Sequence, residues 1–366
     1  MKKIYTQPRT ETVATTPQLI LCASGGIQAQ ISGYKQNTGG GFIQPVIMGI
    51  VCSSLLFLGT ACSTNNTPDQ PKQQAELKPR TLIVSEVESQ KSKVERRLPQ
   101  ATITENGDVL DALWNEGDEV FYRNLSYSYD YYDDDEGKPL YGVLEADKEG
   151  SIASFSGEQV WCAEDDQLAL IYPKIDPAAF TCHDLLTAEY TISVAGQDGS
   201  LATLAKDFHH IYGIASVVSV TETTANAELA EMKSLMTVCK FSFEDKEVPG
   251  TSLPITSLQI KKGGIGSPYI GTYPQEGTVY IAQSVSAWDV SVDPEWETPA
   301  AGGKPLTIDT QGANPTEVYV ALFPDMGATY SFTVISGGNT YTGEATATLN
   351  EGEFVPATGL RLVKQP

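Results

Sequence analysis

Histidine is scarce in this chain of 366 residues. The three histidines, His183, His209 and His210, leave little material for a histidine-rich metal site or for acid–base catalysis by histidine. Basic residues are also few: 24 Lys and Arg stand against 46 Asp and Glu, so the formal net charge is −22 and the isoelectric point is about 4.4. Binding to phosphate backbones or anionic lipid headgroups requires clustered cations. The composition therefore argues against nucleic-acid binding.

The sequence patterns of common enzymes are absent as well. The chain has no G-x-S-x-G, H-E-x-x-H or P-loop pattern and no C-x-x-C pair. Two acidic stretches are candidates: residues 164–166 for a glycosidase-like carboxylate pair, and the Tyr- and Asp-rich residues 127–137 for Ca²⁺. Such groupings arise by chance among 46 acidic residues, and residues 127–137 lack the alternating spacing of a calcium loop. We therefore predict that the protein is not an enzyme and uses no metal ion or other cofactor.

One hydrophobic run, residues 46–61, interrupts this polar chain, and Cys62 follows it. The run is shorter than the roughly 17–25 residues that span a bilayer. Its end, Leu58-Gly-Thr-Ala-Cys62, resembles a bacterial lipoprotein box, in which the cysteine is acylated and becomes the new N-terminus. The alternative is an ordinary buried helix. We predict a leader and lipoprotein signal over residues 1–61, lipidation at Cys62, and a flexible polar linker that begins at residue 63.

Three cysteines would remain after export besides the lipidated one. An odd number permits at most one disulfide, and Cys162 with Cys182 is the nearer pair in sequence. The alternative is that Cys162, Cys182 and Cys239 are buried thiols that pack as small hydrophobic groups.

The rest of the chain consists of short β-prone runs separated by Gly, Pro and Asn turns. The exception is Ser200–Phe208, where Ser200 can cap one or two helical turns. This pattern predicts an all-β protein with two tandem β-sandwiches, over residues 98–222 and 223–366. Residues 62–97 would form a tether and a first strand, which lies within Thr81–Val87.

Four motifs in the first half occur in a recognisable order. They are Trp114-Asn-Glu-Gly-Asp-Glu-Val120, Ala153-Ser-Phe-Ser-Gly157, Ala169-Leu-Ile-Tyr-Pro173 and Gly196-Gln-Asp-Gly-Ser-Leu201. In this order, behind a lipoprotein box, they resemble the N-terminal domain of Bacteroidales fimbrillin-like surface lipoproteins. The resemblance covers about residues 62–366. The sequence departs from the family pattern at Lys233-Ser234, where relatives commonly have a histidine.

The resemblance implies two transthyretin-like β-sandwiches, export to the outer membrane as a lipoprotein, and polymerisation into a surface fimbria that contributes to adhesion. It also implies maturation by a trypsin-like protease that releases the first strand with its lipid. Arg96 and Arg97, the one adjacent pair among six arginines, follow the predicted strand and are the expected cleavage site. The alternative is that they only solubilise a loop. Arg80 is a second candidate, but a cut there would leave the strand attached.

The C-terminus offers a strand for transfer to a neighbouring subunit. Leu360 and Leu362 lie on one face of the predicted strand and Val363 on the other, while Pro356 and Gly359 weaken its pairing. The alternative is an ordinary final strand. The expected partners are other fimbrial subunits, the outer membrane through the lipid, and a host protein or glycan.

A second class of function is a non-polymerising, glycan-binding surface lipoprotein. In that class Trp288, Trp296 or the Tyr127–Tyr132 cluster would stack on sugars.

Overall fold

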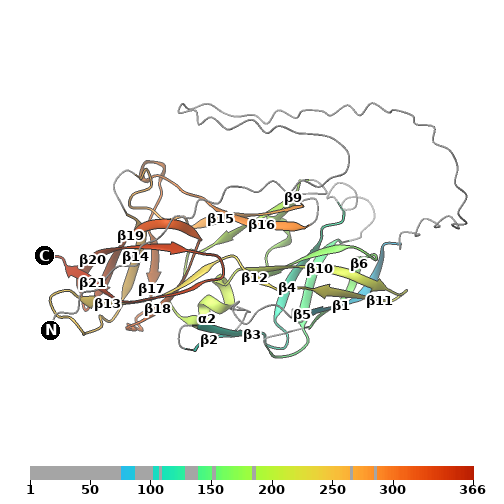
Figure 1. Ribbon diagram of the computed structural model, residues 1–366, viewed down its shortest axis with the longest axis horizontal. Helices are drawn as coiled ribbons and strands as arrows, with labels where there is room; N and C mark the ends of the chain where they lie inside the picture. Colours follow the sequence, from blue (N-terminus) through green and yellow to red (C-terminus); the bar gives the residue numbers. More distant parts are fainter. Residues whose placement is uncertain are drawn as a thin grey trace, which may run out of the picture. The chain divides into compact units, whose positions relative to one another are not determined.

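A computed structural model of the chain describes residues 76–86, 102–106, 109–127, 139–150, 154–183, 187–263, 267–283 and 287–366. The signal segment, Cys62 and the Arg96–Arg97 pair lie outside these residues. None of the described helices has the length and apolar character needed to cross a membrane. The described residues form β-sheets with only short helical turns, so the predicted all-β class is confirmed (Figure 1).

The first sheet has eight strands, in the order β11-β1-β6-β5-β4-β7-β10-β12. With an additional pairing of β10 and β11, seven of these strands form a continuous ring, and β12 extends from β10. The strands are β1 (Lys78–Glu86), β4 (Glu119–Asn124), β5 (Tyr141–Ala146), β6 (Ser154–Cys162), β7 (Gln167–Tyr172), β10 (Ile211–Val220), β11 (Thr224–Leu229) and β12 (Lys233–Ser234).

The second large sheet has seven strands, in the order β17-β14-β19-β20-β21-β13-β18. These are β13 (Thr237–Asp245), β14 (Ser257–Lys262), β17 (Leu306–Asp309), β18 (Val318–Leu322), β19 (Asp325–Ser336), β20 (Asn339–Leu349) and β21 (Phe354–Lys364). Residues 336–339, whose Ser-Gly-Gly-Asn sequence favours a tight hairpin turn, join β19 to β20.

Two smaller sheets complete the described strands. The four-stranded sheet has the order β16-β15-β9-β8, and the hairpin pairs β2 with β3. Their bounds are β2 (Thr102–Asn106), β3 (Val109–Leu113), β8 (Phe180–Cys182), β9 (Thr187–Ser193), β15 (Glu276–Gln283) and β16 (Trp288–Pro294).

Two hydrophobic cores fill the space between the strands. The first lies inside the ring and contains Trp114, whose ring meets Phe155 and Tyr172 edge-on, with centroids 4.8 and 5.5 Å apart. The second extends over the seven- and four-stranded sheets. Side chains alternate along a strand, so Val120 faces the first core while Phe121 faces the second. This double burial explains why β7 is a continuous apolar run after Gln167, and why three apolar or aromatic residues follow one another in β4 at residues 120–122.

Strand pairing crosses the sequence boundary that we predict between residues 222 and 223. On the C-terminal side of that position, β11 and β12 still belong to the ring sheet. Strand β9 pairs with β15, so the four-stranded sheet takes strands from both halves of the chain. The described topology therefore extends the first sheet to Ser234, and the division into two independent sandwiches stays a prediction.

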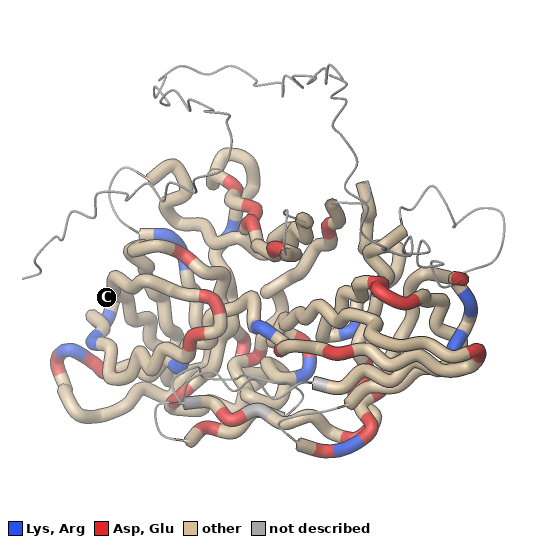
Figure 2. The backbone as a smooth tube through the Cα atoms, turned by 45° about the vertical axis from the view of Figure 1, so that its right-hand side comes forward, with Lys and Arg blue, Asp and Glu red and all other residues tan. Residues whose placement is uncertain are grey.

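Acidic residues are spread widely along the described part of the chain. Figure 2 shows the Asp and Glu positions of the described residues spread over many turns and strand ends. A distribution of this kind suits a solvated surface.

The predicted helical turns are confirmed at α2 (Leu201–Thr203) and η2 (Leu204–Phe208). The Ser200 hydroxyl oxygen accepts a hydrogen bond from the Thr203 backbone N–H at 3.1 Å, as expected of a helix cap.

Two buried histidines follow these turns. His209 is fully buried and His210 is 7% exposed. Nε2 of His210 lies 3.2 Å from the Ser193 carbonyl oxygen, whereas both ring nitrogens of His209 are buried without a hydrogen-bond partner. Because burial disfavours the charged ring, the pKa falls to about 3 for His209 and to about 4 for His210.

These histidines should make the protein sensitive to acid. Their folded-state pKa values lie below the unfolded value near 6.5, so their contribution to stability is complete above pH 6.5 and is lost as the pH falls toward 4. Between pH 6.5 and 5, each histidine should lower the free energy of unfolding by about 2 kcal/mol. Urea unfolding at a series of pH values measures this loss. His210→Gln should flatten the pH dependence relative to the native protein. Equal slopes in the native protein and in this variant would contradict this account.

Candidate functional site

Strand β1 closes the ring, because it lies between β6 and β11 and both partners come from later in the chain. It pairs antiparallel to β6 and parallel to β11. Leu82 and Val84 point inward and are fully buried, while Ile83 between them is 39% exposed. Loss of β1 would therefore leave the edges of β6 and β11 unpaired beside an apolar groove.

The first and last strands of the described fold, β1 and β21, each fill a slot between two neighbouring strands. Of the ladders among described strands, two are parallel: β1 with β11, and β21 with β13. Each of these strands has an antiparallel neighbour on its other side, β6 for β1 and β20 for β21. A terminal strand here is thus held between one parallel and one antiparallel neighbour.

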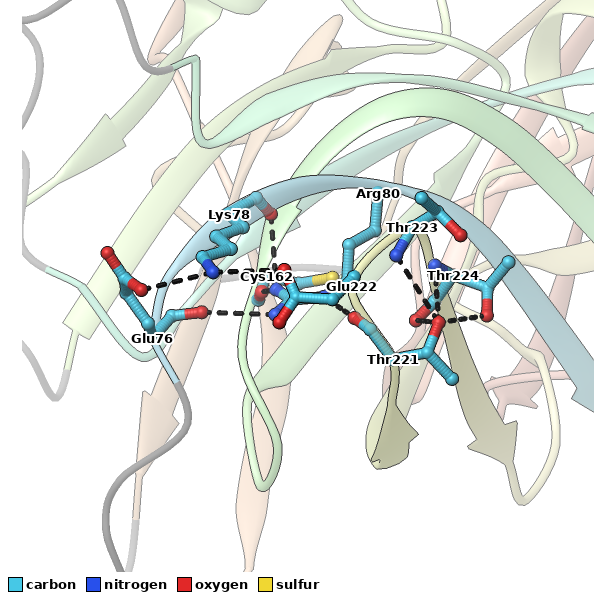
Figure 3. Close-up of polar contacts among 8 residues, drawn as sticks. All are labelled: Glu76, Lys78, Arg80, Cys162, Thr221, Glu222, Thr223 and Thr224. Carbon is cyan, nitrogen blue, oxygen red and sulfur yellow. Dashed lines mark hydrogen bonds and ion pairs between the residues drawn. The ribbon is translucent and has the colours of Figure 1, made fainter.

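A buried guanidinium fixes the start of β1 (Figure 3). Arg80 is 5% exposed, and its side chain donates only to main-chain carbonyl oxygens in the hydrogen bonds found. Nε donates to Thr221 at 2.7 Å, and Nη1 donates to Cys162. Nη1 also donates to Lys78 at 3.3 Å and Nη2 to Glu76 at 3.2 Å, so the guanidinium ties its own strand to the ends of β6 and β10. We call the carbonyl oxygens of Cys162 and Thr221 the carbonyl cage.

Lys78 also carries a positive charge on β1, but it lies at the surface. Its ammonium group is 3.1 Å from a carboxylate oxygen of Glu222 and 3.2 Å from one of Glu76. Hydrogen bonds to Glu222 and then to Glu76 raise the pKa of Lys78. Both carboxylates are largely exposed, so water and salt screen these pairs.

The burial of Arg80 bears on the predicted cleavage sites. Arg96 and Arg97 lie outside the described residues, so cleavage there stays a prediction. Arg80, the second candidate, is enclosed in the folded protein and hydrogen-bonded, which shields it from a protease. Sequence reasoning missed its structural role. The available signal was the alternation Arg80-x-Leu82-x-Val84, which places the guanidinium on the inward face.

The predicted donor strand corresponds to β21. Leu362 is buried and Val363 is 43% exposed, so these side chains lie on opposite faces. The ladder to β20 covers two residue pairs, and Gly359, at φ +67°, lies beside an irregularity in the ladder to β13. An apolar cavity of about 40 Å³ lies under the strand and is lined in part by Val355, Ala357 and Leu360. The donor role of this strand stays a prediction.

The described cysteines are not joined by a disulfide. Cys162 ends β6 and Cys182 ends β8, in different sheets, so the proposed pairing is absent from the structure. Burial raises the pKa of the Cys162 thiol to about 11, and it also raises the pKa of Cys239. Cys162 and Cys239 therefore pack as small apolar groups, as in the alternative interpretation.

Of the candidate carboxylates at residues 164–166, Asp166 serves the fold, whereas Glu164 and Asp165 are exposed. Asp166 is buried and accepts hydrogen bonds from Asn124 Nδ2 at 2.7 Å and from the Ala163 backbone N–H at 2.8 Å. Burial raises its pKa. Most of the Tyr- and Asp-rich stretch, residues 128–138, lies outside the described residues. Within the described ranges, His, Cys, Asp and Glu side chains form no group of three suited to a metal ion.

The tryptophans considered for glycan stacking pack within the protein. Trp296 contacts the rings of Tyr269 and Tyr273, with centroids 5.4 and 5.7 Å away, and the Lys262 ammonium lies 4.8 Å from its ring centroid. Trp288 is partly buried, and its indole nitrogen is enclosed.

Comparisons with known proteins found no matching family model and no matching curated protein. Solved structures with a similar backbone trace include three from Bacteroides. A candidate cell adhesion protein of B. uniformis is 13% identical, with a TM-score of 0.45, over 78% of this chain and 96% of that one. One of B. eggerthii is 12% identical, with a TM-score of 0.35, over 79% and 88%. A fimbrial protein of B. ovatus is 10% identical, with a TM-score of 0.33, over 79% of this chain and 50% of that one. Each TM-score is below 0.5, so no equivalence of individual residues follows.

Strand β1 should contribute strongly to the stability of the ring. Leu82→Ala removes a fully buried side chain and should lower the free energy of unfolding by about 2–5 kcal/mol. Ile83→Ala, on the outward face of the same strand, is the matched control and should cost much less. Urea denaturation of both variants measures the difference. Equal losses would show that β1 does not close the ring in solution.

Proposed function

We propose that the protein is a structural subunit of a bacterial surface fimbria. In this proposal it is exported as a lipoprotein, cut after Arg97 or Arg96, and polymerised by exchange of β1 for a strand from a neighbour. The observation that carries the proposal is the position of β1. It closes the ring, and the residues that follow it include the chain's one adjacent arginine pair.

The physical reason for exchange is the cost of an open ring. Without β1, the main-chain N–H and C=O groups of β6 and β11 that pair with it lose their partners. The apolar groove that Leu82 and Val84 fill is then exposed to water. Burying each such apolar side chain is worth about 1.5–3 kcal/mol. A strand from another copy restores both the main-chain hydrogen bonds and the apolar burial, so the opened subunit binds such a strand.

The lipid and the membrane have a transient role in this proposal. Acylation at Cys62 anchors the precursor to the outer membrane, and cleavage frees the subunit from that anchor. The partners are then further copies or related subunits, and the assembled fimbria presents its surface to a host protein or glycan.

Replacing both Arg96 and Arg97 by Ala should stop polymerisation. The variant should remain a folded monomer, because its own β1 still fills the ring. Polymers resistant to mild SDS, together with N-terminal sequencing, measure the outcome in cells that process the native chain. Lys91→Ala/Lys93→Ala, which removes two charges from the same stretch, is the control and should polymerise. Polymers of the arginine variant that retain residues 81–88 would refute exchange at this site.

Cys62→Ala should abolish labelling by a fatty-acid probe and release the precursor from the membrane. Cys52→Ala, within the hydrophobic run, should be labelled normally. Undiminished labelling of the Cys62 variant would exclude this site.

A further inference from the structure

The surroundings of Arg80 give the ring a chemical preference for the strand that fills it. We propose that the carbonyl cage requires a cationic side chain from the strand that replaces β1, and that Lys364 in β21 of a second copy supplies it. This inference rests on the proposed strand exchange, because the cage is vacated only when β1 leaves.

The cage belongs to the ring and remains when β1 is withdrawn. Arg80 has four carbonyl acceptors: those of Glu76 and Lys78 leave with the strand, whereas those of Cys162 and Thr221 stay (Figure 3). Cys162 is the last residue of β6, and Thr221 directly follows β10. The hydrogen bond to Cys162 is buried and the one to Thr221 is partly buried. Carbonyl oxygens shielded from water are costly without a donor, and two that share one guanidinium attract a positive charge.

The inward face of β1 therefore defines a recognition pattern. Arg80, Leu82 and Val84 are buried, whereas Thr81 and Ile83 between them are exposed. The pattern is one cation followed by two apolar side chains at alternate positions. A carboxylate at the first position would be repelled by the carbonyl dipoles, and an apolar group would leave them unpaired.

Strand β21 carries this pattern when it is read from its C-terminal end. In that direction Lys364, Leu362 and Leu360 take the places of Arg80, Leu82 and Val84. Two outward positions remain, and they are filled by Val363, 43% exposed, and Arg361, whose side chain is 64% exposed. When β21 is read in the direction of β1, the uncharged Thr358 takes the place of Arg80.

The backbone of the slot accepts either direction. Strand β1 has one parallel and one antiparallel neighbour, so a reversed strand also has one of each. The side chains therefore determine the direction of the incoming strand, and they favour one that runs opposite to β1. Three N–H donors on a lysine ammonium are enough for the two carbonyls of the cage.

A competition between peptides tests the cage with the native ring. A recognition sequence for a site-specific protease is placed between Lys93 and Val94 of the full chain, and the cut chain is dissociated in urea. The chain is then diluted into an excess of two peptides of residues 76–88, native and Arg80→Met, mixed in equal amounts. Mass spectrometry measures which peptide is retained. The native peptide should be retained at least tenfold more. Lys78→Met, which removes the surface charge from the same strand, should compete within twofold.

Equal retention of the native and Arg80→Met peptides would overturn the carbonyl cage while leaving strand exchange intact. Retention of neither peptide would refute the exchange site, and with it the proposed function. The same competition with peptides of residues 354–366 tests the donor. Lys364→Met should be retained at least tenfold less than the native peptide, and Arg361→Met should be retained equally. No difference between Lys364→Met and the native peptide would overturn the assignment of Lys364.

The full chain gives a second readout. Lys364 is exposed in its own sheet, so Lys364→Met leaves that sheet's core intact, unlike deletion of residues 354–366, which removes the buried Phe354 and Leu362. Lys364→Met should slow polymer growth at least tenfold, Lys364→Arg should restore it, and Arg361→Met should grow within twofold of the native rate. Native growth by Lys364→Met would overturn the proposal. A native chain that never polymerises would refute the proposed function. The peptide competition would still show whether the carbonyl cage requires a cation.

Discussion

Closure of the ring by β1 is the constraint on which the other features of the first sheet depend. The strand supplies main-chain partners to β6 and β11 at once, and its buried leucine and valine complete the core around Trp114. While β1 is covalently attached, its effective concentration at the slot is far above that of any free strand, so a foreign strand cannot compete. A cut between β1 and the ring would abolish that advantage without changing a contact. In the proposed assembly, cleavage therefore acts as the switch by removing a tether.

Arg80 adds a requirement of charge to this requirement of shape. A guanidinium surrounded by carbonyl oxygens is stable because each of its three nitrogens donates to an acceptor, and the same arrangement makes any unmatched strand unfavourable. Apolar strands are common on the surface of unfolded or partly folded chains, so an apolar groove alone would be poorly selective. One buried cation at the start of the strand, followed by alternating apolar side chains, is a much rarer combination.

Local features of the fold could be predicted from the sequence, whereas long-range pairing could not. The first strand around Leu82, the Ser200 cap and the hairpin at residues 336–339 depend on residues close together in the chain, and the structure confirms them. Closure of the ring by β1, which pairs with β6 and β11, and the pairing of β9 with β15 depend on which distant edges meet, and no local pattern specifies that. The carbonyl cage is hidden for a further reason: its acceptors are main-chain atoms, so their residue types carry no signal.

The two terminal strands also determine what kind of assembly exchange would produce. The slot of β1 lies in the ring, and β21 belongs to the seven-stranded sheet, so donor and acceptor are different surfaces of the subunit. A contact between two different surfaces is heterologous, and it extends into an open filament unless the rotation between copies closes a circle. Residues 98–366, which remain after a cut behind Arg97, hold 13 Lys and Arg against 40 Asp and Glu, and this strong negative charge opposes lateral association of such filaments. Strand exchange at one end and charge repulsion along the sides would together favour growth in one dimension.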